Sequence, residues 1–215
     1  METSFDAIRH GLERLRTAKR QPKVFGAESH RFKLHPPLSE STVRKFEAKH
    51  HIRLPEDYRG FLLNLGNGGA GPFYGVFKLG EMDDCYGFKK WKEGDGFVGL
   101  LAKPFPHTAA WNEQPPEPEE TDDEEEYEKR LDACDAVYWN SENVNGAIPL
   151  CHEGCALRDW LVLTGPEAGH MWHDARADEA GLWPISVGKK RRVTFLEWYI
   201  HWLNEALAKL PMRRG

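Results

Sequence analysis

The sequence CALRDWLVLTGPEAGHMWHD, residues 155–174, contains the pattern that decides the fold. The apolar run 160–163 shows no polar alternation, which is typical of an interior strand with both faces covered. The glycines and proline of 165–169 then predict a turn. Residues 170–174 resume an extended pattern, in which successive side chains point to opposite faces. The stretch therefore predicts a β-hairpin inside a sheet.

Strand patterns also occur on both sides of this hairpin. Short apolar runs bounded by glycine-containing turns indicate strands rather than helices. Residues 80–112 contain several short runs and turns, and no element is assigned there. The further predicted strands are 73–79, 147–150 and 182–187.

Helices are predicted near both ends of the chain from apolar spacing and from start signals. The clearest start is Thr194 with Glu197, which have the spacing of a capping box. Pro55 suits the first position of a helix, where its missing N–H costs nothing. The predicted helices cover residues 4–19, a short segment after the N-cap Ser39, the segment from Leu54 to Gly66, and the segment from Thr194 to about Pro211.

A break in composition interrupts the middle of the chain at about residues 113–130, where prolines precede a dense acidic run. The prolines oppose a helix, whereas the acidic run could begin one that continues through Leu131. We interpret the segment as an exposed insertion in one domain, because neither flank alone has enough strands to close a core. It is either a disordered, solubilising loop or a docking surface for a basic protein.

The length, composition and net charge are those of an ordinary acidic protein with one substantial core. The 215 residues are 40% apolar and 29% charged, with a net charge of -5 and a pI of about 6.1. This acidity argues against direct nucleic-acid binding, and no apolar run is long enough to cross a membrane. The N-terminus shows no secretory signal, and four cysteines do not make a disulfide framework. We therefore expect a cytoplasmic protein with reduced thiols.

Cysteines and histidines cluster around the hairpin. Cys151, Cys155, His170 and His173 offer the ligand types that zinc prefers. The single C-x-x-x-C spacing is poor, however, and the two histidines would lie on opposite faces of one strand. A Cys151–His173 nucleophile pair lacks an activating environment. The glycine-rich loop 66–71 follows a helix and precedes a strand, the reverse of the order in a phosphate-binding loop. We expect no metal, no cofactor and no enzymatic activity.

Three blocks of the sequence, in this order, resemble the SUKH superfamily, in the branch related to the yeast Smi/Knr cell-wall assembly regulators. The most specific block is Leu54-Pro-Glu-Asp-Tyr58, within residues 38–69. The others lie in 148–174 and 193–203. The resemblance implies an α+β fold, with helices packed on a mostly antiparallel or mixed sheet. Residues 1–215 would then form one domain, with an N-terminal helical extension at about 1–37.

The resemblance also implies a function. Bacterial members resemble immunity proteins that block a cognate toxin, often a nuclease, and fungal members are regulatory or adaptor proteins. We expect a cognate toxin as the partner, no nucleic-acid or membrane binding, and a monomer or weak homodimer. A regulatory module without a toxin is the alternative. For Trp172, burial in the sheet is the competing interpretation. The expected contact residues are Tyr74, Glu119, Glu120, Asp122, Asp123, Glu124, Glu125, Glu126, Glu153 and Trp172.

Overall fold

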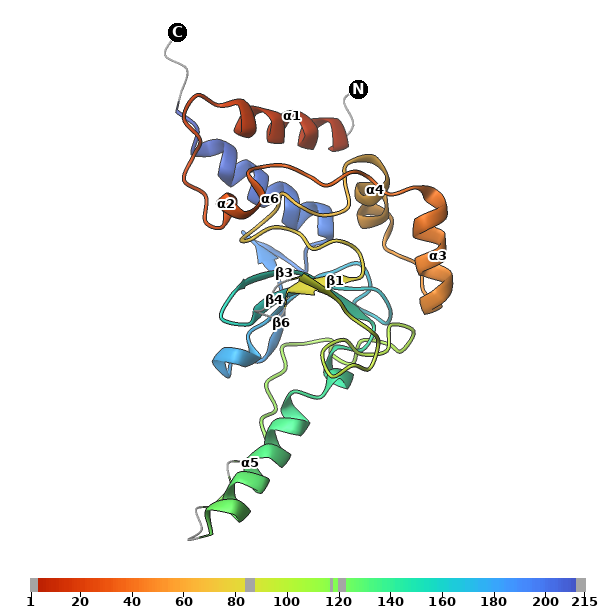
Figure 1. Cartoon of the computed structure of the whole chain (residues 1–215), viewed down its shortest axis with the longest axis vertical. Coiled ribbons are helices and arrows are strands. Elements are labelled where there is room, and N and C mark those ends of the chain that lie inside the picture. Colours follow the sequence, from red (N-terminus) through yellow and green to blue (C-terminus); the bar gives the residue numbers. More distant parts are fainter. Residues whose placement is uncertain (1–3, 84–87, 117, 120–122, 212–215) are drawn as a thin grey trace.

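The main sheet has four antiparallel strands in the order β3-β4-β5-β6 (Figure 1). The computed structural model describes residues 4–83, 88–116, 118–119 and 123–211. The predicted hairpin is confirmed, because β4 pairs with β5 and lies between β3 and β5. The strands are β3 (Ala147–Gly154), β4 (Leu157–Val162), β5 (Met171–Asp174) and β6 (Leu182–Pro184).

The described residues form six α-helices and two short 3-10 helices, which confirms the α+β class. None of these helices combines the length and the apolar character needed to cross a membrane. The Ser39 hydroxyl accepts a hydrogen bond from the Thr42 N–H at 3.2 Å, as expected of an N-cap. The helices are α1 (Ser4–Thr17), α2 (Ala27–His30), α3 (Glu40–His50), α4 (Glu56–Asn64), α5 (Glu124–Tyr138), η1 (Ser141–Val144), η2 (Arg176–Asp178) and α6 (Phe195–Ala208).

Both faces of the hairpin are covered, which explains its unbroken apolar run. On one face, Trp160 stands opposite Trp172, and the Phe105 ring meets Trp172 edge-on at 4.8 Å. On the other face, Asp159 stands opposite His173 and bonds to Trp198 of α6. A strand between two covered faces needs apolar residues at consecutive positions.

Two predicted strands are wrong in detail. Residues 73–79 contain only the single bridge from Val76 to Gly69, because Phe73 and Gly75 take positive φ values of 50° and 103° in a turn. Residues 182–187 form two separate strands, with Ile185 between them.

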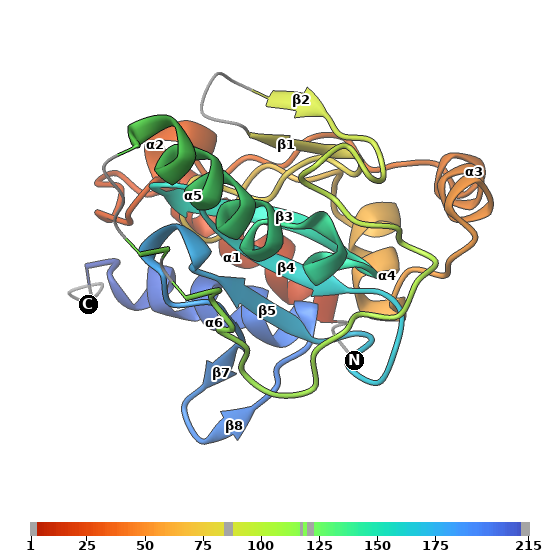
Figure 2. The ribbon, with the colours of Figure 1, turned by 90° about the horizontal axis from the view of Figure 1, so that it is seen from below.

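The described residues also form two small antiparallel sheets, and Figure 2 shows them on opposite sides of the molecule. They are β1 (Glu81–Asp83) with β2 (Phe88–Lys90), and β7 (Ser186–Val187) with β8 (Lys190–Arg191).

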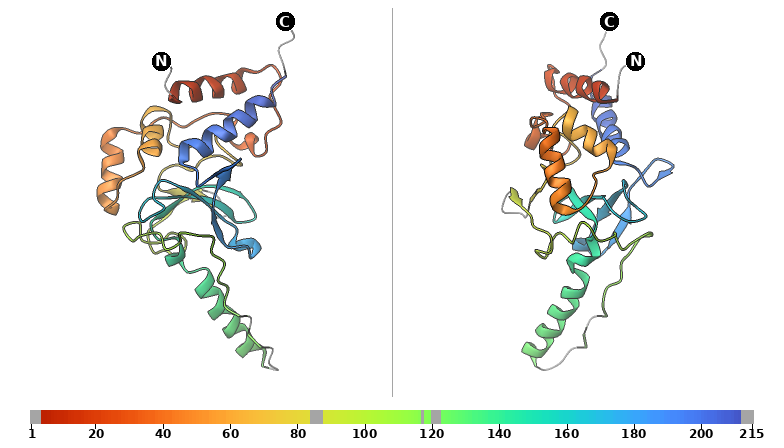
Figure 3. Two further views of the ribbon diagram at one scale, coloured as in Figure 1. Left: turned by 180° about the vertical axis from the view of Figure 1, so that it is seen from behind. Right: turned by 90° about the vertical axis from the view of Figure 1, so that its right-hand side faces the viewer.

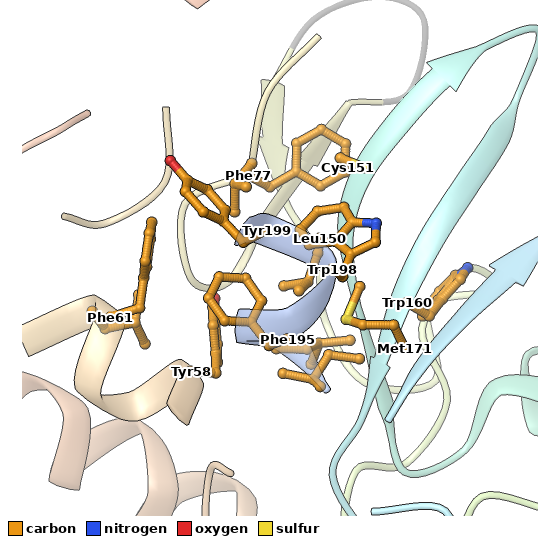
Figure 4. Close-up of a cluster of buried hydrophobic side chains, with 14 of the residues drawn as sticks. Tyr58, Phe61, Phe77, Leu150, Cys151, Trp160, Met171, Phe195, Trp198 and Tyr199 are labelled. Carbon is orange, nitrogen blue, oxygen red and sulfur yellow. The ribbon is translucent and has the colours of Figure 1, made fainter. Parts of the chain in front are cut away.

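Helix α6 is the centre of the aromatic core (Figure 4). The Phe195 ring meets Tyr58 at 4.9 Å and Phe61 at 5.0 Å, both from α4. Tyr199, one turn further along α6, donates its hydroxyl proton to the Ala70 carbonyl at 2.8 Å. This helix therefore joins α4 and the glycine-rich loop into one core.

The start of α6 is held both by its own residues and by α4. Within α6, the predicted capping relation is present, since the Glu197 carboxylate accepts from the Thr194 N–H at 3.0 Å. From α4, Asp57 Oδ2 accepts from the Leu196 N–H at 3.1 Å, across 139 residues of sequence. A carboxylate here satisfies an orphan N–H and also favours the positive end of the helix dipole.

Helix α1, which lies in the predicted N-terminal extension, packs into the core. It lies across α6 (Figure 3) and buries Ile8, Leu12 and Leu15. The crossing is close at Gly11, where an added Cβ would come within 3.0 Å of the Leu203 side chain. The absence of a side chain at Gly11 therefore sets how near the two helices approach.

We predict that Asp57→Ala lowers the free energy of unfolding by about 1–2 kcal/mol, because the Leu196 N–H loses its partner. Urea unfolding measures the change. The matched control is Glu56→Ala, which removes an exposed acid from the same first turn and should cost less than about 0.5 kcal/mol. Equal losses in the two variants would contradict the capping role.

A buried histidine makes the fold sensitive to acid. His30 is 8% exposed, and its Nδ1 accepts from the Phe32 N–H at 3.0 Å. Burial lowers the pKa of His30 to about 4, although the nearby backbone of Gly71 and the charge of Glu28 act in the opposite direction. The folded protein therefore holds this imidazole neutral.

We predict that part of the stability lost between about pH 6.5 and pH 4 comes from His30. Over this range the unfolded chain binds a proton that the folded chain does not, so the free energy of unfolding falls as the pH falls. The contribution of His30 reaches about 3 kcal/mol at most. Urea unfolding at several pH values should give a shallower fall for His30→Gln than for the wild type. An unchanged slope would contradict this assignment.

Candidate functional site

The acidic insertion forms an arm that projects from the main sheet (Figures 1 and 3). The helix extends from Glu124 to Tyr138, so the acidic run begins a helix that continues through Leu131 and beyond, and these residues do not form a disordered loop. Asp123 caps it by accepting from the Glu126 N–H at 3.2 Å. The contact candidates Glu119, Asp123, Glu124, Glu125 and Glu126 are exposed on the arm, and Glu120 and Asp122 lie outside the described residues.

The base of the arm is fixed to the sheet by a buried ion pair. Arg176 donates two hydrogen bonds to Asp174 of β5, at 2.9 and 2.7 Å. The same guanidinium donates to the Tyr138 carbonyl at 3.2 Å and lies 5.0 Å from the Trp139 ring. The Tyr138 hydroxyl donates to Asn112 Oδ1 at 2.6 Å, which joins the two sides of the arm. The arm therefore has a firm attachment.

The arm separates charge within the molecule. Residues 113–138 contain 12 of the 34 acidic side chains and 2 of the 29 basic ones, a net charge of -10. The rest of the chain is consequently at +5. The net charge of -5 for the whole protein therefore conceals a strongly acidic arm on a basic body.

A second surface feature is a groove of about 740 Å³ on the body. Tyr74 forms part of its wall and stacks on His152 at 4.8 Å with an angle of 16°. His152 Nε2 lies 3.0 Å from Asp83 Oδ2. Phe25, 62% exposed, meets the Tyr74 ring edge-on at 5.3 Å. The groove also includes Arg31, Lys33 and Lys78.

The predicted contact residue Tyr74 thus borders a groove, whereas two others face inward. Trp172 is 0% exposed, which supports its competing interpretation as a core residue. Glu153 is half-buried, and its carboxylate points to His173. The groove itself was not predicted, because its residues come from three distant parts of the sequence.

Three neighbouring strands bring two carboxylates and one imidazole together. His173 Nδ1 of β5 lies 2.9 Å from Asp159 Oδ1 of β4 and 3.0 Å from Glu153 Oε1 of β3. A shift in register between His152 and Gly154 places Glu153 in a β-bulge, a feature that re-aims a side chain. Asp159 Oδ2 accepts from Trp198 Nε1 at 2.9 Å. We call Glu153, Asp159 and His173 the sheet triad.

The two carboxylates of the triad strongly affect the pKa of its imidazole. Burial lowers the pKa of His173, but hydrogen bonds and charges from Asp159 and Glu153 outweigh this effect and raise it to about 10. Asp159 is 2% exposed, a position at which an ionised carboxylate needs partners. The sequence signal for this site was Asp159 itself, one acid placed directly before an apolar run.

The cysteines and histidines considered as zinc ligands in the sequence do not come together. Within the described part of the chain, the donors that come together are those of the sheet triad, without Cys151, Cys155 or His170. Cys151 is buried and Cys155 is exposed, while His170 Nδ1 faces Glu167 at 3.6 Å. Burial and the nearby carboxylates raise the pKa of Cys151 well above its usual range, so this thiol is not activated as a nucleophile.

The comparisons with known proteins identify one family. Residues 37–179 match the model of the SMI1 / KNR4 family (SUKH-1). No curated protein and no solved structure gives a significant match to the chain.

We predict that Arg176→Met loosens the base of the arm. The substitution leaves Asp174 buried without its cation, which should cost about 3–5 kcal/mol of stability. Amide hydrogen exchange should increase at the base of the arm, around Tyr138. Arg130→Met is the control, since it breaks an exposed ion pair with Glu126 and should cost less than about 1 kcal/mol. Unchanged exchange in Arg176→Met would show that the pair does not fix the arm.

Proposed function

Because the chain belongs to the SMI1 / KNR4 family (SUKH-1), we propose that it is a non-enzymatic immunity protein that binds and neutralises a cognate bacterial toxin. We further propose a nuclease-type toxin as the partner and the cytoplasm as the compartment. The nuclease-type partner is supported by the charge of the arm and by the resemblance described above, whereas the compartment is supported by the resemblance alone.

The acidic arm is the observation that carries this proposal. A nuclease binds its substrate through a basic surface, because much of nucleic-acid affinity comes from phosphate contacts. An arm with a net charge of -10 offers dense negative charge to the same surface. Its attachment through Arg176 and Asp174 holds that charge in a defined direction. Opposite charges on two partners also accelerate their encounter.

The proposal that the protein is not an enzyme rests on the state of its reactive groups. The Cys151 thiol is buried and protonated, and the His173 imidazole is engaged by two carboxylates. Neither arrangement supplies the activated nucleophile or free base that hydrolytic chemistry requires.

A regulatory or adaptor role is the second candidate function, and the groove beside Tyr74 favours it. An exposed aromatic residue, Phe25, next to a hollow with basic residues suits a protein contact that does not need the arm. The two functions therefore predict different binding surfaces on the same molecule.

Co-expression tests the immunity function directly. Toxin domains encoded next to this gene would be expressed with and without the protein, and cell survival and nuclease activity would be measured. Rescue with formation of a stable complex is the expected result. If no neighbouring toxin is bound or neutralised, the immunity function is wrong and the adaptor role is favoured.

We predict that the double variant Glu124→Gln/Glu128→Gln slows association with the toxin about three- to tenfold at low salt, with little change in the dissociation rate. Both side chains are exposed on the arm. Stopped-flow or biolayer measurements at several salt concentrations give the rates.

The matched control is Glu56→Gln/Glu205→Gln, which removes the same charge from exposed positions on α4 and α6. Equal slowing in both variants would indicate a general charge effect rather than docking through the arm. Slowing by Tyr74→Ala alone would instead place the partner at the groove.

A further inference from the structure

The sheet triad has the composition and spacing of a cation site. It offers one imidazole nitrogen and two carboxylate oxygens, and its ligand atoms all lie within 4.8 Å of one another. The donors come from three adjacent strands, so the backbone pairing of the sheet fixes their relative positions. Ligands on rigid elements are held more precisely than ligands on loops.

The hydrogen-bonding capacity of the triad is mismatched without an ion. His173 Nδ1 faces Asp159 Oδ1 at 2.9 Å and Glu153 Oε1 at 3.0 Å. A single N–H proton points well at one oxygen, so the other oxygen receives a weaker interaction. A metal ion lying between the three atoms would satisfy all of them at once.

The burial of the site also favours a cation. Asp159, the central residue, is 2% exposed and lies beside a second carboxylate, that of Glu153. Two carboxylates held together away from water need compensating positive charge, which a divalent ion supplies.

An outer partner orients the central ligand. Trp198 Nε1 of α6 donates to Asp159 Oδ2 at 2.9 Å, which directs Oδ1 toward the other two donors. Hydrogen bonds of this kind to the far oxygen of a ligand are a regular part of metal sites. Side-chain exposures of 15% for His173 and 17% for Glu153 leave an ion a path from solvent.

We propose that Glu153, Asp159 and His173 bind one divalent transition-metal ion, with Zn²⁺ preferred. Imidazole and carboxylate ligands together suit zinc, and three protein ligands leave a fourth position for a partner's side chain. The ion would join β3, β4 and β5 and, through Trp198, the helix α6. This site is separate from both the arm and the groove.

Calorimetric titration of the untagged, chelator-treated full chain with ZnCl₂ tests the proposal. We expect one ion per chain, and at least about tenfold weaker binding in Glu153→Gln. His170→Gln is the control, because that imidazole faces a single carboxylate, Glu167. It should bind zinc as the wild type does. Cys155→Ser removes the exposed thiol and should also leave the binding unchanged.

X-ray absorption at the zinc edge of the wild-type complex gives an answer that does not depend on the folding of a variant. Nitrogen and oxygen scatterers alone are the expected result. Sulfur in the first shell would overturn the proposal, since it would place the ion on a cysteine. An absence of zinc binding by the wild type, or unchanged binding by a folded Glu153→Gln variant, would overturn it equally.

Discussion

Two carboxylates fix helix α6, and the rest of the fold depends on where that helix lies. Asp57 of α4 accepts from the Leu196 N–H at its start, and Asp159 of β4 accepts from the Trp198 indole two residues further along. One bond joins α6 to the helical layer and the other joins it to the sheet. The acid in the block Leu54–Tyr58 of this chain therefore has a physical role, because Asp57 caps a helix that is distant in the sequence.

The acidic arm is compatible with this core because it leaves the sheet pairing intact. The arm ends before η1, and the buried Arg176–Asp174 pair next to β5 anchors its base. The helix α5 beyond that anchor is stabilised mainly by its own cap and by ion pairs one turn apart, such as Glu125 with Lys129. The sequence of the arm can therefore change without a change in the core.

The elements that sequence reasoning predicted are those specified by local patterns. The hairpin of 155–174, the Ser39 cap and the capping relation of Thr194 with Glu197 each depend on residues a few positions apart. The segment 73–79 was predicted as a strand because its apolar residues do not reveal the turn at Gly75. The groove and the sheet triad depend on residues from distant segments, which pattern analysis does not bring together. Glu153 shows the limit most clearly, since the bulge that turns it toward His173 has no signal in the local sequence.

The arm at -10 and the body at +5 also make the molecule a large electric dipole. At a pH near 6.1 the whole chain carries no net charge, yet each end keeps a strong field of its own. A uniform electric field orients such a molecule even when the molecule has no net charge. It should therefore be retained on an anion-exchange resin at its isoelectric pH, held by one end only, and it should meet any cationic surface with the same end first.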